Sequence, residues 1–483
     1  MKNIIIAVCT VIITSTAFGQ YLTGNWEGKL DVKGVMVPLV FHIIKDSIGN
    51  LAASFDSPLQ KAFNLPCNEV IIKQDSVIFL MKILNGKYAA LLSGDEKTMH
   101  GTWYQGGGQL ALDMVKTSDV ATLKEIKRPQ TPKPPFPYTS EDVQYYNANK
   151  NIRFGATFTK PYIAPNESPT KKKYPAVLLI TGSGPQDRDE TLLNHKPFAV
   201  IADYLSRRGI AVLRVDDRGM GSSTGIFDQS TTADFAKDVE AGIAYLETRE
   251  DVNIKKIGLL GHSEGAMIAP IVASRNPIVA FIVLLAGPGI RITELMEQQS
   301  IDVATASGIP AKELVQYRTL YHQLMNTIIY EKDTTIAIGK ATSIFKLWQK
   351  GKPASLVMNT TGVSDEGSLH AFVQSFVHQL SGTWFSYFIK INPVVYLEKV
   401  KCPTLALNGE KDVQVSAGPN LNGIRKALNK AKNIHFETKV LPGLNHLFQH
   451  CTKCSVDEYA DLEETFAPEA LKIIGDWITG ITH

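Results

Sequence analysis

The second half of this chain carries a series of short runs in which nearly every residue is apolar. A strand that faces water on one side alternates apolar and polar residues, so unbroken runs indicate strands buried on both faces. Strands of this kind belong to mainly parallel sheets that carry helices on both sides. The runs are 176–180, 210–213, 257–260, 278–285 and 404–407. They predict a doubly wound α/β domain.

Helical patterns fall between these runs, as that fold requires. Phe235, Val239, Ile243 and Leu246 recur at the spacing that forms one apolar stripe on a helix. Residues 290–395 interrupt the alternation of strand and helix with a long segment of helical character. Because the sheet resumes directly after it, we expect a helical cap inserted into the α/β domain rather than a third independent domain.

Residues 20–120 have a different texture, with short alternating runs separated by Gly, Asn and Asp. This pattern predicts a small all-β sandwich or barrel. A linker at 121–139 follows, with five prolines among the thirteen residues of 127–139. Proline-rich segments are extended and semi-rigid, so this one marks a domain boundary. The α/β domain then spans 140–483.

The first 19 residues are typical of a secretory signal peptide. They combine a short positive start, an apolar segment from Ile4 to Ile13, and small residues at Ala17 and Gly19 before a cut at Gln20. We therefore expect an exported protein, periplasmic or secreted. No later run approaches about 18 apolar residues, so no integral membrane segment is expected once the signal is removed.

Charge and cysteine usage narrow the classes of partner. A formal net charge of +3 over 483 residues provides no strong field for nucleic acid. Cys451 and Cys454 form a C-x-x-C pattern, which in an exported protein favours a local disulfide. A zinc site would need further ligands, so no metal and no cofactor are predicted. The expected partner is a small molecule, and the oligomeric state stays open.

Residues 261–265 read GHSEG, directly after the apolar run 257–260 and before a helical stretch at 266–273. A nucleophilic serine is often exposed at a sharp turn that joins a strand to a helix. Glycines on either side of the serine avoid collisions across such a turn. A plain tight turn is the alternative. We assign Ser263 as the nucleophile.

A serine hydroxyl needs a base to become a nucleophile, and the base needs a carboxylate that orients it. We expect both at the ends of later strands. Asp412 follows the strand that starts at Thr404, and His446 follows a strand that ends near Val440. Glu410 is the alternative acid.

An oxyanion needs two backbone N–H donors. We assign one to Glu264, the residue after the nucleophile, and the other to Ser183 in the glycine-rich turn 181–184, with Gly184 as the alternative.

Two further residues are predicted to line the substrate pocket. They are His195, in the loop after the run 176–180, and Trp384, in an aromatic cluster that closes the cap.

Six segments resemble the exported bacterial α/β-hydrolase family serine esterases that are esterase D-like and carry an N-terminal β domain. They are TGSGPQDRDE, RVDDRGMGSSTG, GHSEGAMIAP, LLAGPG, LNGEKDVQV and LPGLNH, spread over about residues 140–480. The resemblance implies an α/β-hydrolase fold with nucleophile Ser263, acid Asp412, base His446 and an oxyanion turn at 182–184. The family usually opens that turn with His-Gly, whereas this chain has Thr181 before the glycine.

The predicted function is hydrolysis of carboxylic esters through a Ser-His-Asp triad and an acyl-enzyme intermediate. A serine peptidase or aminopeptidase of the same fold is the second interpretation, with Asp187, Asp189 or Glu190 available for a substrate amine. The third is a non-catalytic binding protein with a decayed hydrolase domain. The sequence does not identify the ester or the length of its acyl chain.

Overall fold

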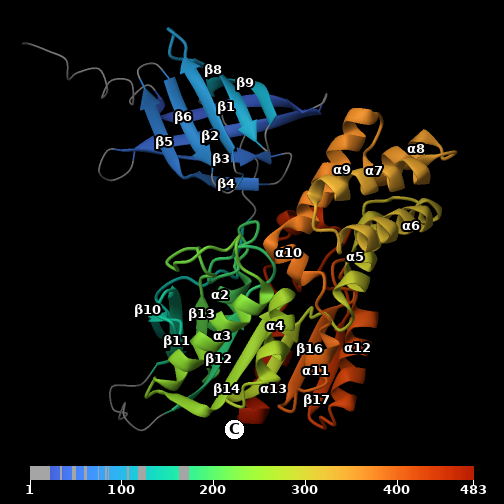
Figure 1. Ribbon diagram of the computed structural model, residues 1–483. Helices are drawn as coiled ribbons and strands as arrows, with labels where there is room; N and C mark the ends of the chain where they lie inside the picture. Colours follow the sequence, from blue (N-terminus) through green and yellow to red (C-terminus); the bar gives the residue numbers. More distant parts are fainter. Residues whose placement is uncertain are drawn as a thin grey trace, which may run out of the picture. The chain divides into compact units, whose positions relative to one another are not determined.

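The computed structural model describes residues 22–32, 35–45, 50–58, 62–73, 76–81, 84, 86–105, 108–117, 127–162 and 173–482 (Figure 1). The predicted signal peptide and residues 121–126 of the predicted linker lie outside these ranges. The chain forms two compact units, residues 1–127 and 128–483. In the part that is described, no helix combines the length and apolar character needed to cross a membrane.

The N-terminal unit is one antiparallel sheet, whose described strands run in the order β4-β3-β2-β1-β9-β8-β7-β6-β5. They are β1 (Gly24–Val32), β2 (Val35–Lys45), β3 (Leu51–Ser57), β4 (Ala62–Cys67), β5 (Glu69–Lys73), β6 (Ser76–Met81), β7 (Gly86–Leu92), β8 (Thr98–Gln105) and β9 (Gly108–Thr117). Because β3 also contacts β5 and β4 contacts β6, the sheet curls until its two ends approach each other. The predicted all-β domain is confirmed, as a nearly closed barrel.

Aromatic side chains fill the inner face of this sheet. Trp26, Phe41, Phe55, Phe79 and Tyr88 are almost fully buried, and the Phe41 ring centroid lies 4.9 Å from that of Phe79. Successive residues of a strand point to opposite faces, so an inward aromatic residue alternates with an outward polar one. That alternation is the sequence pattern by which the domain was recognised.

The C-terminal unit is built on a mixed sheet, with described strands in the order β10-β11-β13-β12-β14-β15-β16-β17. They are β10 (Tyr138–Tyr146), β11 (Arg153–Pro161), β12 (Tyr174–Ile180), β13 (Ala211–Val215), β14 (Val252–His262), β15 (Val279–Leu285), β16 (Thr404–Gly409) and β17 (Phe436–Leu441). The strands from β13 to β17 pair in parallel, and β10 and β11 add an antiparallel edge. The predicted doubly wound sheet is confirmed, with all five apolar runs in strands β12 to β16.

Helices cover both faces of this sheet (Figure 1). On one face lie α2 (Pro197–Arg207) and α13 (Pro468–Thr482); on the other lie α3 (Thr232–Glu247), α4 (Glu264–Ala273), α11 (Val394–Leu397) and α12 (Ala417–Lys430). Val177 and Leu179 of β12 face the first layer, whereas Leu178 and Ile180 face the second. Each strand must therefore be apolar at every position, which explains the unbroken runs.

The chain between β15 and β16 is helical, as the predicted cap requires. Its helices, before α11, are α5 (Ile292–Ala306), α6 (Ala311–Ile328), α7 (Thr334–Gln349), α8 (Ala354–Thr361), α9 (Glu366–Ser381) and α10 (Thr383–Phe388). Aromatic rings join them: the Tyr321 and Phe376 centroids lie 5.7 Å apart, and those of Phe345 and Phe372 lie 5.3 Å apart. A short 3-10 helix, η3 (Val456–Asp461), follows β17.

The start of the proline-rich segment belongs to the C-terminal unit. Arg128 donates to the carbonyl oxygens of Leu193, Ala460 and Leu462 at 2.7 to 3.0 Å. Gln130 exchanges hydrogen bonds with the backbone of Phe466, donating at 2.7 Å and accepting at 3.0 Å. Residues 128–130 therefore secure the loop around η3 instead of acting as a free linker.

We expect the start point of a truncated chain to decide its stability. A chain that begins at Lys127 retains Arg128 and Gln130, whereas one that begins at Pro137 loses both. The hydrogen bonds of these two residues should contribute about 2 kcal/mol to the free energy of unfolding. Their loss should therefore lower the midpoint of thermal unfolding by about 5 °C. Thermal unfolding of the two truncated chains, compared by circular dichroism, measures this. Equal midpoints would show that the segment contributes nothing.

Candidate active site

Ser263 occupies a sharp turn between β14 and α4. Its backbone angles, φ 53° and ψ −114°, lie where residues other than glycine are rarely found. A Cβ atom on Gly261 would lie 2.1 Å from the backbone of Gly265, and one on Gly265 would lie 2.1 Å from the Ile180 carbonyl oxygen. Both glycines are therefore obligatory, and the turn presents a serine at the end of a buried strand.

Asp412 and His446 meet at the ends of β16 and β17. His446 Nδ1 lies 2.8 Å from Asp412 Oδ2, and both side chains are buried. Asp412 Oδ1 accepts the backbone N–H groups of Gln414 and Val415, both at 2.8 Å. A carboxylate held this way accepts a hydrogen bond from Nδ1–H, which leaves Nε2 of the imidazole as the nitrogen that can take a proton.

The alternative acid, Glu410, lies elsewhere. Its side chain is half exposed, accepts the Gly443 N–H at 3.1 Å and pairs with Lys411. The structure therefore brings Asp412, and not Glu410, to the imidazole of His446.

Ser263 and His446 face a common pocket of about 120 Å³. Its lining residues are Gly182, Ser183, Gln186, Glu190, Leu192, His195, Pro197, His262, Ser263, Gln414, His446, Leu447 and Thr465. Among the hydrogen bonds of the described residues, none joins Ser263 Oγ to the His446 ring. Such bonds are often long in unliganded sites and shorten when substrate binds.

The two predicted oxyanion donors both lie beside this pocket. Glu264 is the first residue of α4, where helical amides have no partner within the helix. In the described part of the chain, neither the Glu264 N–H nor the Ser183 N–H has a hydrogen-bond acceptor. The Gly182 N–H is different, because it donates to Glu190 Oε1 at 2.7 Å. Two backbone donors are thus available next to the serine.

The Glu264 side chain points away from the pocket and explains the position of Trp384. Its carboxyl group is buried, accepts the Thr232 hydroxyl at 2.7 Å, and receives the Trp384 indole N–H at 3.0 and 3.1 Å. Burial raises the pKa of Glu264. Trp384 does not line the Ser263 pocket, contrary to the prediction. A buried carboxyl group needs donors, and the indole N–H supplies one.

We expect Trp384→Phe to destabilise the fold through Glu264. The substitution keeps the ring but removes the N–H, which should cost about 1–3 kcal/mol because the buried carboxyl group loses a donor. Trp348→Phe is a matched control, since the Trp348 N–H donates to the Gln316 carbonyl oxygen at 2.9 Å in the cap. Urea unfolding measures the free energy of unfolding of both variants. A smaller loss of unfolding free energy in Trp384→Phe than in Trp348→Phe would contradict this account.

His195 lines the pocket, as predicted, but both of its ring nitrogens are already engaged. Nε2–H donates to the Tyr459 carbonyl oxygen at 2.9 Å, and Nδ1 lies 3.0 Å from the Thr465 hydroxyl. Burial, together with the charge of Arg128, lowers the pKa of His195 to about 4. A neutral imidazole bonded on both sides serves as pocket wall and not as an acid or base.

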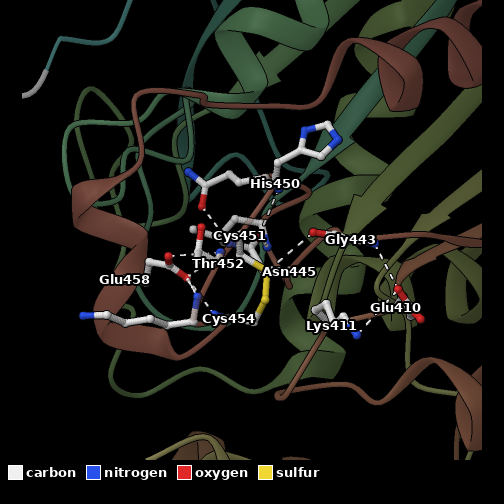
Figure 2. Close-up of a disulfide and its surroundings, with 12 residues drawn as sticks. Glu410, Lys411, Gly443, Asn445, His450, Cys451, Thr452, Cys454 and Glu458 are labelled. Carbon is white, nitrogen blue, oxygen red and sulfur yellow. Dashed lines mark hydrogen bonds and ion pairs between the residues drawn. A yellow bond between two sulfur atoms is a disulfide. The ribbon is translucent and has the colours of Figure 1, made fainter.

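A disulfide secures the loop that follows His446. Cys451 and Cys454 are joined, and the Cys451 N–H donates to the Gly443 carbonyl oxygen on the other side of the loop (Figure 2). The Glu458 carboxylate accepts the N–H groups of residues 452–454 at 2.6 to 3.2 Å. The two sulfur atoms and a Glu458 carboxylate oxygen lie within 4.8 Å of one another, which is close enough to hold a metal ion. Because the sulfur atoms are bonded to each other, the two cysteines and Glu458 instead form a structural clamp on the loop.

Sequence reasoning missed a second histidine–carboxylate pair beside the site. His262 Nδ1 lies 3.0 Å from Glu190 Oε1, and both side chains are buried. From the sequence, Glu190 is predicted only as a partner for a substrate amine. Its inward direction depends on a backbone φ of 52°, for which the segment DRDE gives no signal. The pocket residues Gln414, Leu447 and Thr465 were missed because separate loops bring them together.

The sheet order, the serine turn and the Asp–His pair at the strand ends are those of an α/β-hydrolase fold. A family model described as serine aminopeptidase, S33, matches residues 195–307. Esterase EstD of Thermotoga maritima is 27% identical over 286 residues, which cover 58% of this chain and 61% of that protein. The match thus spans less than two thirds of this relative.

Solved structures that are similar to this chain include the following two. The Pyrococcus furiosus esterase PF2001 has a TM-score of 0.43 and 16% identity, with 74% of this chain and 99% of that chain covered. Est1E of Butyrivibrio proteoclasticus, solved with ferulic acid, has a TM-score of 0.37 and 14% identity, with 70% and 98% covered.

Proposed function

We propose that this protein is a serine hydrolase that cleaves carboxylic esters through an acyl-enzyme on Ser263. The observation that carries the proposal is the 2.8 Å hydrogen bond between Asp412 and His446, which orients a base toward the pocket that also contains the serine. The strained turn at Ser263 supports the same role, since strain of this kind is concentrated at functional sites.

In the first half of the reaction, His446 Nε2 takes the Ser263 hydroxyl proton as Oγ bonds to the ester carbonyl carbon. The carbonyl oxygen becomes an oxyanion, which the N–H groups of Ser183 and Glu264 stabilise. The tetrahedral intermediate then expels the alcohol, and the imidazolium returns its proton to the leaving oxygen. Ser263 now carries the acyl group.

In the second half, His446 takes a proton from water as the water oxygen bonds to the acyl carbon. The same two N–H groups stabilise the second oxyanion. Collapse of this intermediate breaks the bond to Ser263 Oγ, which regains its proton from the imidazolium. The acid leaves and the free enzyme is restored.

The pocket favours small acyl groups. Its volume of about 120 Å³ is well below that of the usual site for a drug-sized ligand, and its wall exposes more apolar than polar surface. Leu192, Pro197 and Leu447 supply the apolar part of the wall. Acetyl and short branched acyl esters fit these properties better than long acyl chains.

A fluorophosphonate probe and a panel of nitrophenyl esters test the proposal. We expect the probe to label Ser263, as located by peptide mass spectrometry, and hydrolysis to fall from acetyl to octanoyl esters. A protein that neither reacts with the probe nor hydrolyses any ester would refute catalysis and favour the binding-protein interpretation.

The second candidate is a serine aminopeptidase, which the matching family model favours by its description. Of the three acids considered for the substrate amine, Asp187 accepts bonds from Thr191, and Asp189 pairs with Arg214 and Lys196. Only Glu190 lines the pocket. Comparing kcat/KM for aminoacyl anilides and acetyl esters distinguishes the two functions, and faster cleavage of the anilides would select the peptidase.

We further propose that the protein is exported and that the signal peptide is cleaved before Gln20. The residue pattern of the first 19 positions and the Cys451–Cys454 disulfide both support an oxidising compartment. N-terminal sequencing of the protein from its native cells tests the cleavage, and an intact Met1 start would contradict it.

A further inference from the structure

Glu190 and His262 connect two parts of the site that the chain brings together from distant positions. His262 Nε2 lies 3.0 Å from the backbone carbonyl oxygen of His446, and His262 Nδ1 lies 3.0 Å from Glu190 Oε1. Glu190 Oε1 also accepts the Gly182 N–H at 2.7 Å. A continuous chain of hydrogen bonds therefore runs from the oxyanion turn to the loop of the base.

The turn at Gly182 lies against both this pair and the nucleophile. A Cβ atom on Gly182 would lie 3.2 Å from Glu190 Oε1, 3.4 Å from Ser263 Cβ and 3.5 Å from His262 Nδ1. A shift of Glu190 would therefore move the turn that carries the Ser183 N–H. Because Glu190 occupies the Gly182 N–H, it also leaves Ser183 as the donor of that turn.

The partners of His262 determine its protonation. A carbonyl oxygen only accepts, so Nε2 must carry a hydrogen. Nδ1 faces a carboxylate oxygen, which in its ionised form also only accepts, so Nδ1 carries a second hydrogen. Burial alone lowers the pKa of His262, but the Glu190 charge and these hydrogen bonds more than offset it and raise the pKa. The ring is then an imidazolium, and its Nε2 edge faces His446 with the ring centroids 4.9 Å apart.

We propose that Glu190 and His262 are positioning residues, a buried ion pair that holds the oxyanion turn and the His446 loop in the geometry required for acyl transfer. This rests on the proposed hydrolase function and deepens it. The pair touches neither reacting atom, so it acts through Gly182, Ser183 and the backbone of His446.

Glu190→Gln tests the proposal in the full-length enzyme. The amide oxygen can still accept from Gly182, but His262 loses its counter-charge and becomes neutral. We expect kcat on an acetyl ester to fall about 10- to 100-fold with KM nearly unchanged, the loss typical of a misplaced catalytic group.

Glu464→Gln is the matched control. Glu464 accepts from His450 Nδ1 at 2.9 Å, an exposed histidine–carboxylate pair that lies close to His446 in sequence but outside the pocket. We expect its kcat and KM to equal those of the wild type. An unchanged kcat in Glu190→Gln, or a change in KM alone, would overturn the proposal.

Two further measurements cover the remaining outcomes. His262→Gln keeps a donor for the His446 carbonyl but cannot carry a charge, so it should reproduce the loss of kcat at unchanged KM. If neither variant folds, nitrogen-15 spectra of histidine-labelled wild-type protein show whether His262 is protonated. An Nδ1 atom without a hydrogen on His262 at pH 7 would refute the ion pair. Failure of the proposed function is distinguishable, since the wild type would then show neither Ser263 labelling nor ester hydrolysis.

Discussion

Ser263→Ala is expected to lower turnover of an acetyl ester by about a millionfold, because the three residues of a triad act as a unit and the loss of one disables the others. The position of the serine supports this expectation. The turn that presents it requires glycine at positions 261 and 265, and Ser263 lines the same pocket as His446. Stopped assays with high enzyme concentration measure the residual rate. Circular dichroism shows whether the fold is kept.

Two variants on the same helix serve as controls for the serine. Ser274→Ala removes a hydroxyl at the far end of α4, where it donates to the Ile271 carbonyl oxygen, and should leave turnover unchanged. Glu264→Gln keeps the backbone N–H at the oxyanion position and should lower turnover far less than Ser263→Ala. Substantial ester hydrolysis by a folded Ser263→Ala protein would refute the mechanism.

Much of the fold was predictable because buried strands leave a direct trace in the sequence. In β12, Leu178 faces α3 and α4 while Leu179 faces α2 and α13, so no position tolerates a polar side chain. The edge strands β10 and β11 were not predicted. β10 alternates buried and exposed positions and follows directly after prolines, so it reads as a continuation of the linker.

The positions of the candidate triad were predictable for a related reason. In a parallel sheet, the carboxyl ends of the strands meet at one edge, and Asp412 and His446 each follow a strand end. Side-chain direction was not predictable. Trp384 turns to Glu264, and Glu190 turns to His262, because each buried charge takes the donors that tertiary packing brings to it. Sequence spacing carries no information about that choice.

Asp412→Asn is expected to lower turnover by about ten thousandfold, the effect of presenting the base in the wrong tautomer. Asp412 Oδ2 now accepts from His446 Nδ1 and its Oδ1 accepts two backbone N–H groups. An asparagine can satisfy those amides with its oxygen, which turns its own NH₂ group toward His446. Nδ1 must then accept, the proton moves to Nε2, and the imidazole can no longer take the proton of Ser263.

The paired variant Glu410→Gln shows whether the loss in Asp412→Asn comes from the orientation of His446 or only from the removal of a negative charge on this loop. Glu410 lies two residues away on the same loop, but it is half exposed and bonded to Gly443 and Lys411. Its loss of charge should change turnover by less than about threefold, since exposed charges interact weakly through water. Fluorophosphonate labelling adds a second readout: Asp412→Asn should react far more slowly than Glu410→Gln, because the same base activates Ser263 toward the probe. The reverse ranking of the two variants would assign the acid to Glu410 and would require the loop after β16 to rearrange on substrate binding.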